Sequence, residues 1–391
     1  MISSRHPLIR QGFHWLIGSL VAVHACMAVT RVTAALWLLH AGYGEWTVGV
    51  LMSLTAAGPV LLSLWAGRLA DRYGLRRPLR YGALMGLAGA LPAFIYPSPW
   101  TIAPAALLCG SAVGVMAVAI QREAGLMGED AGELKRVFSW VALGPAFSNA
   151  VSPVIAGLLI DHIGTRAAFG LAVLLPFASW MLGLRVPRHA PRGHDAQGER
   201  KRAAWTLLRE SGLRNLLILN VVLSACWDAH SFVVPIVGHA QGLSASSIGL
   251  VLGAFATAAV VVRLVIARWS AQLDEMVVLR TAMSVVTVVL LVYAWLPGTP
   301  GLLFGSSLLG LALGSYQPMI LSALHQVTPP DRHGQALGLR MLVSSGMSMT
   351  MPLGFGLLAS STVVFAPLWL MAGLALAAQW PAHQVRGALG R

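Results

Sequence analysis

The sequence contains few charged residues, and acidic residues are the scarcest. Asp, Glu, Lys and Arg make up 10% of its 391 residues, with 14 acidic residues against 27 basic ones. A typical soluble domain carries about 25% charged residues. Hydrophobic residues make up 57% of the chain. This composition predicts an integral membrane protein and excludes an ordinary soluble domain.

Enzyme, metal and cofactor patterns are also lacking. The three cysteines, Cys26, Cys109 and Cys226, lie in apolar stretches, so we expect buried free thiols and neither a disulfide framework nor a zinc site. There is no Gly-x-Ser-x-Gly elbow and no nucleotide-binding P-loop. We therefore expect no metal, no cofactor and no use of ATP. A membrane-embedded enzyme or a non-transporting receptor remains a remote alternative.

Long apolar runs, each long enough for the roughly 20 residues that cross a bilayer, predict twelve membrane spans. They cover residues 13–39, 47–66, 80–97, 101–121, 137–160, 167–185, 215–238, 247–267, 277–296, 301–323, 338–359 and 363–381. An even number of spans places both termini on one side of the membrane.

The basic residues are distributed unevenly about these spans. Only Arg166 falls on a predicted outer loop, and Arg31, Arg263 and Arg340 lie inside spans or at their ends. The other basic residues fall on one side, which by the positive-inside rule is the cytoplasm. We expect a multi-pass protein of the cell inner membrane with both termini cytoplasmic. Its basic loops would face anionic lipid headgroups rather than nucleic acid.

One long polar connection divides the chain. Residues 186–214 are rich in arginine, with prolines and glycines in their first half. We predict an N-terminal six-helix bundle (1–185), a cytoplasmic linker (186–214) and a C-terminal six-helix bundle (215–391). Within the linker, Ala203 to Leu208 either forms a short interfacial helix or stays solvated.

The two predicted bundles repeat each other in sequence. At an offset of 200, Cys26 pairs with Cys226, Gly49 with Gly249, Arg80 with Arg280, Gly110 with Gly310 and Gly114 with Gly314; at 199, Pro153 pairs with Pro352 and Gly157 with Gly356. These shared offsets predict two halves built on one plan.

The charged loop after the second predicted span has the sequence Gly67-Arg68-Leu69-Ala70-Asp71-Arg72-Tyr73-Gly74-Leu75-Arg76-Arg77-Pro78-Leu79. It resembles the G-x-L-A-D-R-x-G-R-K-x-x-L motif between the second and third helices of the major facilitator superfamily of secondary transporters. Leu75 departs from it, because a basic residue is usual there. We expect Gly67 to let helices approach closely and Gly74 to turn the chain at positive φ. The alternative is an ordinary basic loop.

This resemblance implies an all-α membrane fold of twelve transmembrane helices in two pseudo-symmetric six-helix bundles. It further implies a monomer that works by alternating access, with the substrate bound between the bundles. In the superfamily an arginine near the end of the fourth span engages the loop aspartate. We therefore expect a gate in which Arg122 meets Asp71, with Arg72 and Arg76 in the same loop. Alternatively, Arg122 anchors its span at the membrane surface.

Ionisable residues inside spans are expensive to bury and are functional candidates. Asp228 is the one carboxylate that we place deep in a span, where it is poised to bind and release a proton, with Arg31 as its partner. A fixed salt bridge between helices is the alternative. Arg263 and Arg340 either bind an anionic group of the substrate or extend to the membrane surface; we favour the surface slightly for Arg340.

Four further side chains are candidates for the transport pathway. His24 and His230 either relay protons or make helix-to-helix hydrogen bonds. Trp140 and Trp227 lie deep enough in their spans to line a substrate cavity.

The fifth span carries Pro145, Pro153 and Gly157, with Pro352 and Gly356 as the repeat of the last two. Residues 152–157 resemble a degraded form of the Gly-Pro motif of the drug and metabolite antiporter branch. We expect a helix bend there, although proline and glycine are common in membrane helices.

The fourth span lacks the arginine of many proton-coupled members. On balance we predict proton-coupled efflux of a small amphiphilic or anionic organic molecule, with proton-coupled import of an organic anion as the alternative.

Overall fold

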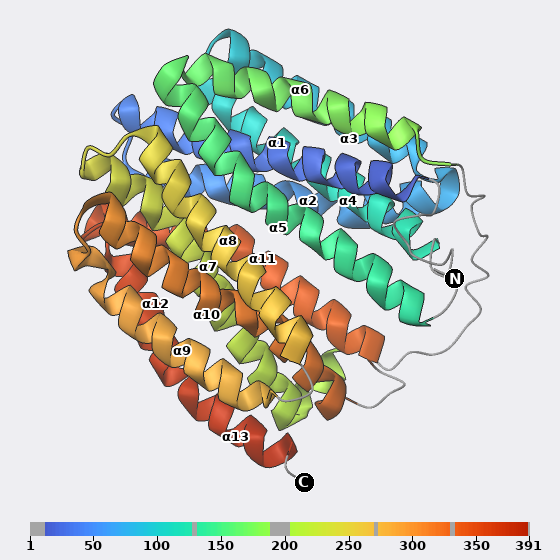
Figure 1. Cartoon of the computed structure of the whole chain (residues 1–391), viewed down its shortest axis with the longest axis vertical. Helices are drawn as coiled ribbons and strands as arrows, with labels where there is room; N and C mark the ends of the chain where they lie inside the picture. The colour runs from blue at the N-terminus through green and yellow to red at the C-terminus, as the bar shows by residue number, and fades with distance from the viewer. Residues whose placement is uncertain (1–11, 127–130, 188–203, 270–272, 329–332, 390–391) are drawn as a thin grey trace. The chain divides into compact units, whose positions relative to one another are not determined.

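The computed structural model describes residues 12–126, 131–187, 204–269, 273–328 and 333–389, which contain helices and connections but no strand (Figure 1). The α-helices are α1 (Phe13–His40), α2 (Glu45–Tyr73), α3 (Arg76–Ile95), α4 (Pro99–Leu126), α5 (Ala131–His162), α6 (Thr165–Leu184), α7 (Ser211–Ala240), α8 (Ala245–Trp269), α9 (Glu275–Val292), α10 (Gly298–Val327), α11 (His333–Ser361), α12 (Ala366–Ala377) and α13 (Gln379–Leu389). We call the end of the helices that carries the α1–α2 connection the α1–α2 end, and the opposite end the α2–α3 end.

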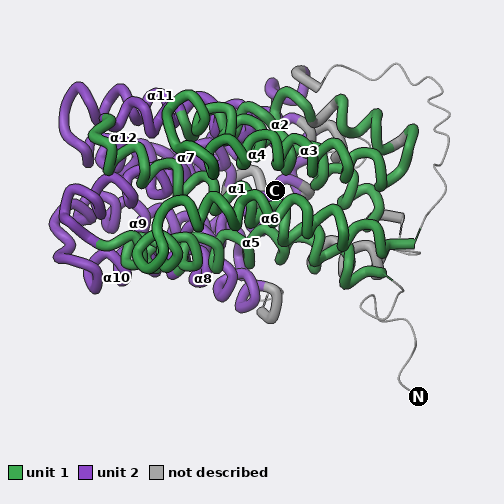
Figure 2. Tube along the Cα trace, turned by 90° about the horizontal axis from the view of Figure 1, so that it is seen from above, with its two compact units in different colours: residues 1–43, 51–195, 244–253 green, residues 44–50, 196–243, 254–391 purple. Residues whose placement is uncertain are grey.

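The helices form two compact units, coloured separately in Figure 2. Unit 1 comprises Met1–Tyr43, Leu51–Asp195 and Ser244–Gly253, and unit 2 comprises Gly44–Val50, Ala196–Leu243 and Ala254–Arg391. Each unit thus includes the first turns of one helix from the other half of the sequence. In the predicted linker, residues 188–203 lie outside the described part of the chain, and a short 3₁₀ helix spans Ala204–Arg209.

The packing of the two halves follows one plan. In the first half α1 packs against α4, α5 and α6, and α3 packs against α4 and α6. In the second half α7 packs against α10, α11 and α12, and α9 packs against α10 and α12. Each of these contacts recurs six helices further along the chain. The prediction of two pseudo-symmetric six-helix bundles is therefore confirmed.

The repeated glycines sit where helix backbones touch. A Cβ on Gly110 of α4 would overlap the carbonyl oxygen of Thr55 on α2, and a Cβ on Gly310 of α10 would overlap that of Phe255 on α8. Lipid tails are as apolar as leucine, so close packing of backbones is a main source of helix association in a membrane. The same small residue therefore solves the same packing problem in both halves.

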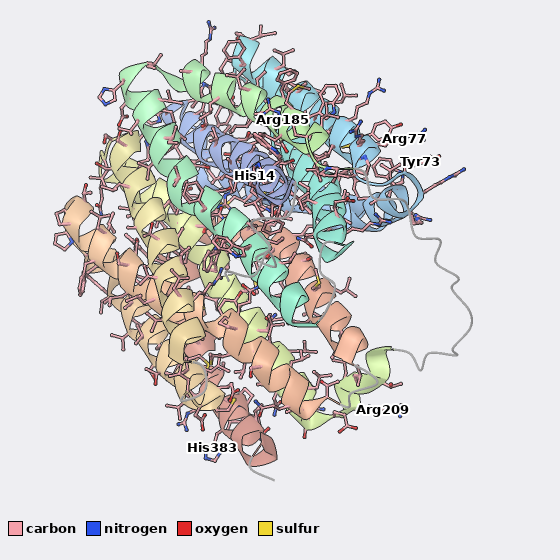
Figure 3. The ribbon with its side chains drawn as sticks, turned by 45° about the vertical axis from the view of Figure 1, so that its right-hand side comes forward. His14, Tyr73, Arg77, Arg185, Arg209 and His383 are labelled. Carbon is pink, nitrogen blue, oxygen red and sulfur yellow. The ribbon has the colours of Figure 1, made fainter. Side chains whose placement is uncertain are left out.

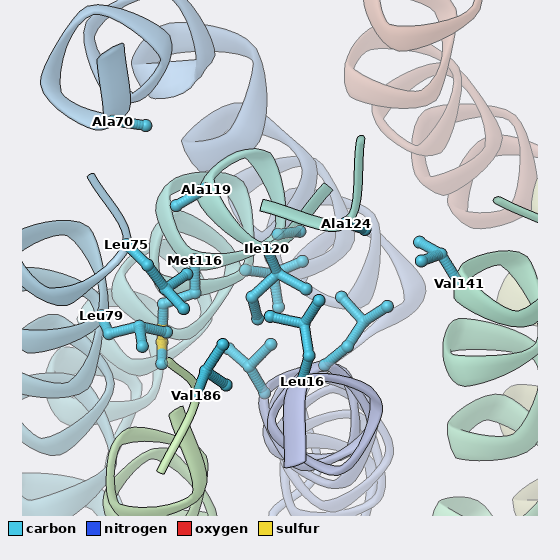
Figure 4. Packing of buried hydrophobic residues seen from close by; sticks show 14 of the residues in the cluster. Leu16, Ala70, Leu75, Leu79, Met116, Ala119, Ile120, Ala124, Val141 and Val186 are labelled. Carbon is cyan, nitrogen blue, oxygen red and sulfur yellow. The ribbon is translucent and has the colours of Figure 1, made fainter. Parts of the chain in front are cut away.

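An apolar cluster fills the α2–α3 end of unit 1 (Figure 4). Leu16 of α1, Met116 and Ile120 of α4, and Leu79 of α3 are each fully buried. Val186, just after α6, closes the cluster. The cluster joins helices α1 to α5 at the end from which the linker leaves.

Ten helices are long and apolar enough to cross a membrane, considering only the described residues. α3, α12 and α13 are not among them. The predicted span 363–381 is two helices, α12 and α13, with Ala378 between them. Pro381 explains the break, because its ring would collide with the carbonyl group four residues earlier, at Ala377, in a continuous helix. All three cysteines are buried and free, as predicted.

Candidate functional site

The first side of the candidate site in unit 2 is a polar zipper between α7 and α11. Asn220 of α7 is fully buried; its Nδ2 donates to Ser344 Oγ at 2.6 Å, and its Oδ1 accepts from Arg340 Nη1 at 3.2 Å. Two turns after Asn220 on α7 and one turn after Ser344 on α11, Ser348 Oγ donates to Asp228 Oδ2 at 2.8 Å. Residues four apart share one helix face, so these bonds line a single polar stripe.

α8 and α10 supply the second side. Arg263 of α8 donates from Nε to the carbonyl oxygen of Gly314 at 3.3 Å and from Nη2 to Gln317 Oε1 at 3.1 Å. Next to Gln317, the Tyr316 hydroxyl lies 2.9 Å from Ser224 Oγ of α7. The charges of Asp228, Arg263 and Arg340 all act on this hydroxyl.

We call this set of side chains the polar cluster: Asn220, Ser224, Asp228, Arg263, Tyr316, Gln317, Arg340, Ser344 and Ser348. It holds two guanidinium groups against one carboxylate. Arg340 Nε is buried and has no hydrogen-bond partner in the part of the chain that the structure describes. The cluster therefore has donor capacity and positive charge suited to an anionic group.

The structure shows the surroundings of two predicted site residues, Arg263 and Arg340. Arg263 and Arg340 are both half-buried, and both guanidinium groups bond to neighbouring helices of unit 2. For Arg340 this position favours the interior alternative over extension to the membrane surface.

His230 lies in a separate, fully buried contact. Its Nε2 is 2.9 Å from Ser306 Oγ, which is also 2.7 Å from the Tyr293 hydroxyl. The imidazole stacks on Phe255 with ring centroids 4.2 Å apart, and Trp227 meets the same ring edge-on at 4.4 Å. These contacts join α7, α8, α10 and the turn after α9. They match the alternative in which His230 makes helix-to-helix hydrogen bonds.

The remaining predicted pathway residues are dispersed. His24 bonds through Nδ1 to the carbonyl oxygen of Leu20 on its own helix, at 3.0 Å. Trp140 is 37% exposed. Arg31 lies in unit 1 and Asp228 in unit 2, and their pairing stays a prediction.

The charged loop after α2 differs in part from its prediction. Gly74 has φ +67°, as expected for the turn residue. Within the described residues Gly67 does not mediate a close approach, because a Cβ placed there would meet none of their atoms within 4 Å. This expectation was wrong because the motif records a residue type and not the distance to the nearest helix. The side chain of Asp71 lies outside the described part of the structure, so its contact with Arg122 is a prediction.

Arginines of the charged loop after α2 contact an aromatic ring and the C-terminus of α6. The Arg77 and Arg72 guanidinium carbons stand 3.7 and 5.2 Å from the centroid of Tyr73, beside which Figure 3 shows Arg77. Arg76 Nη2 lies 3.4 Å from the carbonyl oxygen of Leu184, the last residue of α6. The Arg76 contact joins the turn between α2 and α3 to the end of α6.

Arg122, the predicted gate residue, forms an ion pair with its neighbour Glu123, with Nη1 and Oε2 4.0 Å apart. Glu123 is only 1% exposed near the end of α4. Sequence reasoning missed this buried carboxylate because it stands at the boundary of a predicted span.

The predicted helix-bend residues lie in α5 and α11, both of which continue through their prolines. In unit 1 the carbonyl oxygen of Pro153 and the Cα of Gly157 contact the start of α8. In unit 2 the carbonyl oxygen of Pro352 and the Cα of Gly356 contact the start of α2. Pro145 lies two turns before Pro153 in α5. Within the described residues, no group of three or more His, Cys, Asp and Glu could hold a metal ion.

Comparison with known proteins identifies the family. The sequence profile of the Major Facilitator Superfamily matches residues 16–352. The tetracenomycin C resistance and export protein of Streptomyces glaucescens is 26% identical over 206 residues, which cover 48% of this chain and 34% of that protein. The probable 3-phenylpropionic acid transporter of Escherichia coli (strain K12) is 29% identical over 184 residues, which cover 46% of each chain.

Among solved structures, that of the nucleoside transporter NupG matches with a TM-score of 0.72 at 13% identity, covering 95% of this chain and 98% of that one. This likeness concerns the fold. Since the family profile covers most of the chain and the helices form two bundles on one plan, the chain belongs to the Major Facilitator Superfamily of membrane transporters.

Proposed function

We propose that this protein is a proton-coupled secondary transporter that exports a small organic anion from the cytoplasm. Its two bundles would alternate access across the cell inner membrane, with both termini cytoplasmic and the α1–α2 end outside. The main support for an anionic substrate is the pair of interior arginines, Arg263 and Arg340, in the polar cluster.

The polar cluster suits a carboxylate or a similar anion. A guanidinium group presents several N–H donors in a fixed plane that matches a carboxylate, and Arg340 Nε is a buried donor without a partner among the described residues. Burying two cations against a single carboxylate is costly, so an anionic substrate would lower that cost by adding a second negative charge. Tyr316 and the serines add neutral donors. Trp227, next to Asp228 on α7, adds apolar surface.

Asp228 is the proposed proton carrier. It stands in the middle of α7, where its charge acts on Tyr316 and its carboxylate accepts from Ser348. Protonation of Asp228 would leave the two arginines without an opposing charge inside the cluster and would thereby strengthen anion binding, a coupling that moves proton and anion together and fits the import candidate. In export the anion would bind the deprotonated form, in which two guanidinium groups still outnumber the one carboxylate. Arg31 is its proposed partner in the other unit. The competing role for Asp228 is a fixed ion pair.

The relatives support different directions of transport. Similarity to a tetracenomycin export protein favours efflux, as does the degraded antiporter motif in α5. Similarity to a probable 3-phenylpropionic acid transporter favours import of an organic acid, which is the second candidate. Both candidates use the same arginines. We take the chain to act as a monomer, and an enzyme or receptor role stays remote.

Substitution of Arg340 by glutamine tests the substrate class. In proteoliposomes that hold the purified full chain, we expect Arg340→Gln to raise the KM for an aromatic monocarboxylate such as 3-phenylpropionate about tenfold or more, since a hydrogen bond to a charged group contributes about 1.5–3 kcal/mol. The matched control is Arg280→Gln, because Arg280 bonds to Gln379 at the edge of unit 2, away from the cluster.

Unchanged KM for every organic anion in Arg340→Gln and in Arg263→Gln would refute the anion assignment. Accumulation or depletion of labelled substrate in vesicles of known orientation decides between import and export.

A further inference from the structure

Asp161, near the end of α5, binds the first turn of α8. Its Oδ1 accepts from the backbone N–H of Ala245 at 3.0 Å, and its Oδ2 accepts from that of Ser246 at 2.7 Å. α8 begins at Ala245, so these are N–H groups that have no partner within their own helix. Ser244 Oγ accepts from the third, on Ser247, at 3.2 Å. A carboxylate on another helix thus completes the cap of α8.

Backbone contact along two turns accompanies this cap. A Cβ on Gly157, one turn before Asp161, would overlap the carbonyl oxygen of Ala245, and a Cβ on Gly249 would overlap the carbonyl oxygen of Pro153. Pro153, Gly157 and Asp161 are spaced by four residues and share one face of α5. We call the contact between this face and residues 245–249 the α5–α8 seam; all of it lies in unit 1.

The repeat provides an internal comparison. In unit 2, Gly49 of α2 lies against the carbonyl oxygen of Pro352, and Gly356 lies near the backbone of Glu45. This α2–α11 seam has the same glycines and proline at the repeat positions. The repeat position of Asp161, however, holds Ser360, whose hydroxyl donates to the carbonyl oxygen of Leu357 on its own helix at 3.1 Å. The carboxylate cap therefore belongs to only one of two otherwise equivalent seams.

We propose that Asp161 is a positioning residue of the transport cycle, a latch that holds the first turn of α8 on α5 and releases when the outer side opens. A negative charge at a helix N-terminus is favoured by the helix dipole, and hydrogen bonds to a carboxylate are about twice as strong as neutral ones. The glycines allow the two backbones to meet. Asp161 adds two hydrogen bonds to the first turn of α8, and both break together when that turn leaves α5. This inference rests on the proposed transport function.

Spin labels at the α1–α2 end measure the latch directly. Ile163→Cys follows α5 and Gln241→Cys precedes α8, and both positions are exposed, whereas the native cysteines are buried. Pulsed electron resonance on the full chain in lipid nanodiscs gives the populations of short and long distances between the two labels. We expect Asp161→Asn, which removes the charge and keeps the shape, to increase the ratio of long to short distances about tenfold, equivalent to ~1.4 kcal/mol.

Asp161→Glu should restore part of the short-distance population, and Ser360→Ala should leave the distribution unchanged because Ser360 bonds within its own helix. Thermal unfolding of each variant separates the latch from a general loss of stability. A distribution in Asp161→Asn that equals that of the parent protein would overturn the latch, whether or not transport changes. A shifted distribution in a protein that transports no organic anion would uphold the latch and overturn the proposed substrate.

Discussion

At the scale of single residues, the structure separates two polar groups of α7 that the sequence alone could not distinguish. Asp228 and His230 stand two residues apart and point in different directions along the helix surface. Asp228 joins the polar cluster and remains half-buried, whereas His230 is fully buried against Ser306 and Phe255. Residue type therefore identified both side chains as candidates for the transport pathway. The orientation of α7 places only Asp228 in the polar cluster.

The contacts of His230 predict a structural effect of its substitution. His230→Ala removes the bond to Ser306 and the stacking on Phe255, so we expect a loss of about 1–2 kcal/mol of stability, the upper range for one interhelical hydrogen bond in a membrane. The dependence of transport on the pH gradient should stay as in the parent protein. Thermal unfolding in detergent and gradient-driven flux measure the two effects. A stable variant that has lost its gradient dependence would instead make His230 a proton relay.

The rest of the polar cluster was hard to predict for the same reason. Asn220, Ser344 and Ser348 are ordinary polar residues in apolar spans, and nothing in their type marks them as a site. Their spacing by four on α7 and α11 was a usable signal, because it places them on one face of each helix. Which faces meet depends on the rotation of each helix in its bundle, and that depends on packing over the whole unit.

At the scale of helices, tight packing at repeated glycines governs how the bundles assemble. Gly110 and Gly310 contact carbonyl oxygens of a neighbouring helix, whereas a Cβ on Gly67 would meet no atom of the described residues within 4 Å. The repeat offsets pointed to the first two, since equal positions in two halves built on one plan meet equal neighbours. The family motif pointed to Gly67, and its packing role was wrong. α13 was missed because its first residues, Gln379 to Pro381, fall within the predicted span 363–381.

This difference predicts opposite tolerance to a single methyl group. Gly110→Ala places its Cβ against the Thr55 carbonyl oxygen, so α2 and α4 must separate, at a cost of about 1–3 kcal/mol, typical of overpacking. Gly67→Ala should be neutral or slightly stabilising, because alanine favours a helix by about 1 kcal/mol over glycine. Thermal unfolding of the two purified variants makes the comparison. Equal loss of stability in both would contradict the packing assigned to these glycines.

At the scale of the whole molecule, the sequence predicted most of the architecture. Apolar runs predicted the helices, the shared offsets predicted two halves on one plan, and the superfamily profile and the helix contacts confirm that plan. The composition of the units was less predictable. α2 and α8 each begin in one unit and continue in the other, because their first turns pack on α11 and α5. Such seams are invisible to hydropathy, which reports depth in the membrane but not neighbours.

The central claim is that movement of an organic anion through this protein is coupled to protons by Asp228. The most direct test is flux of labelled 3-phenylpropionate and related acids in proteoliposomes, with and without an imposed pH gradient, for the parent protein and Asp228→Asn. We predict gradient-driven flux in the parent protein and loss of the gradient dependence in the variant, with an unchanged midpoint of thermal unfolding. Gradient-driven flux that survives intact in Asp228→Asn would contradict the account.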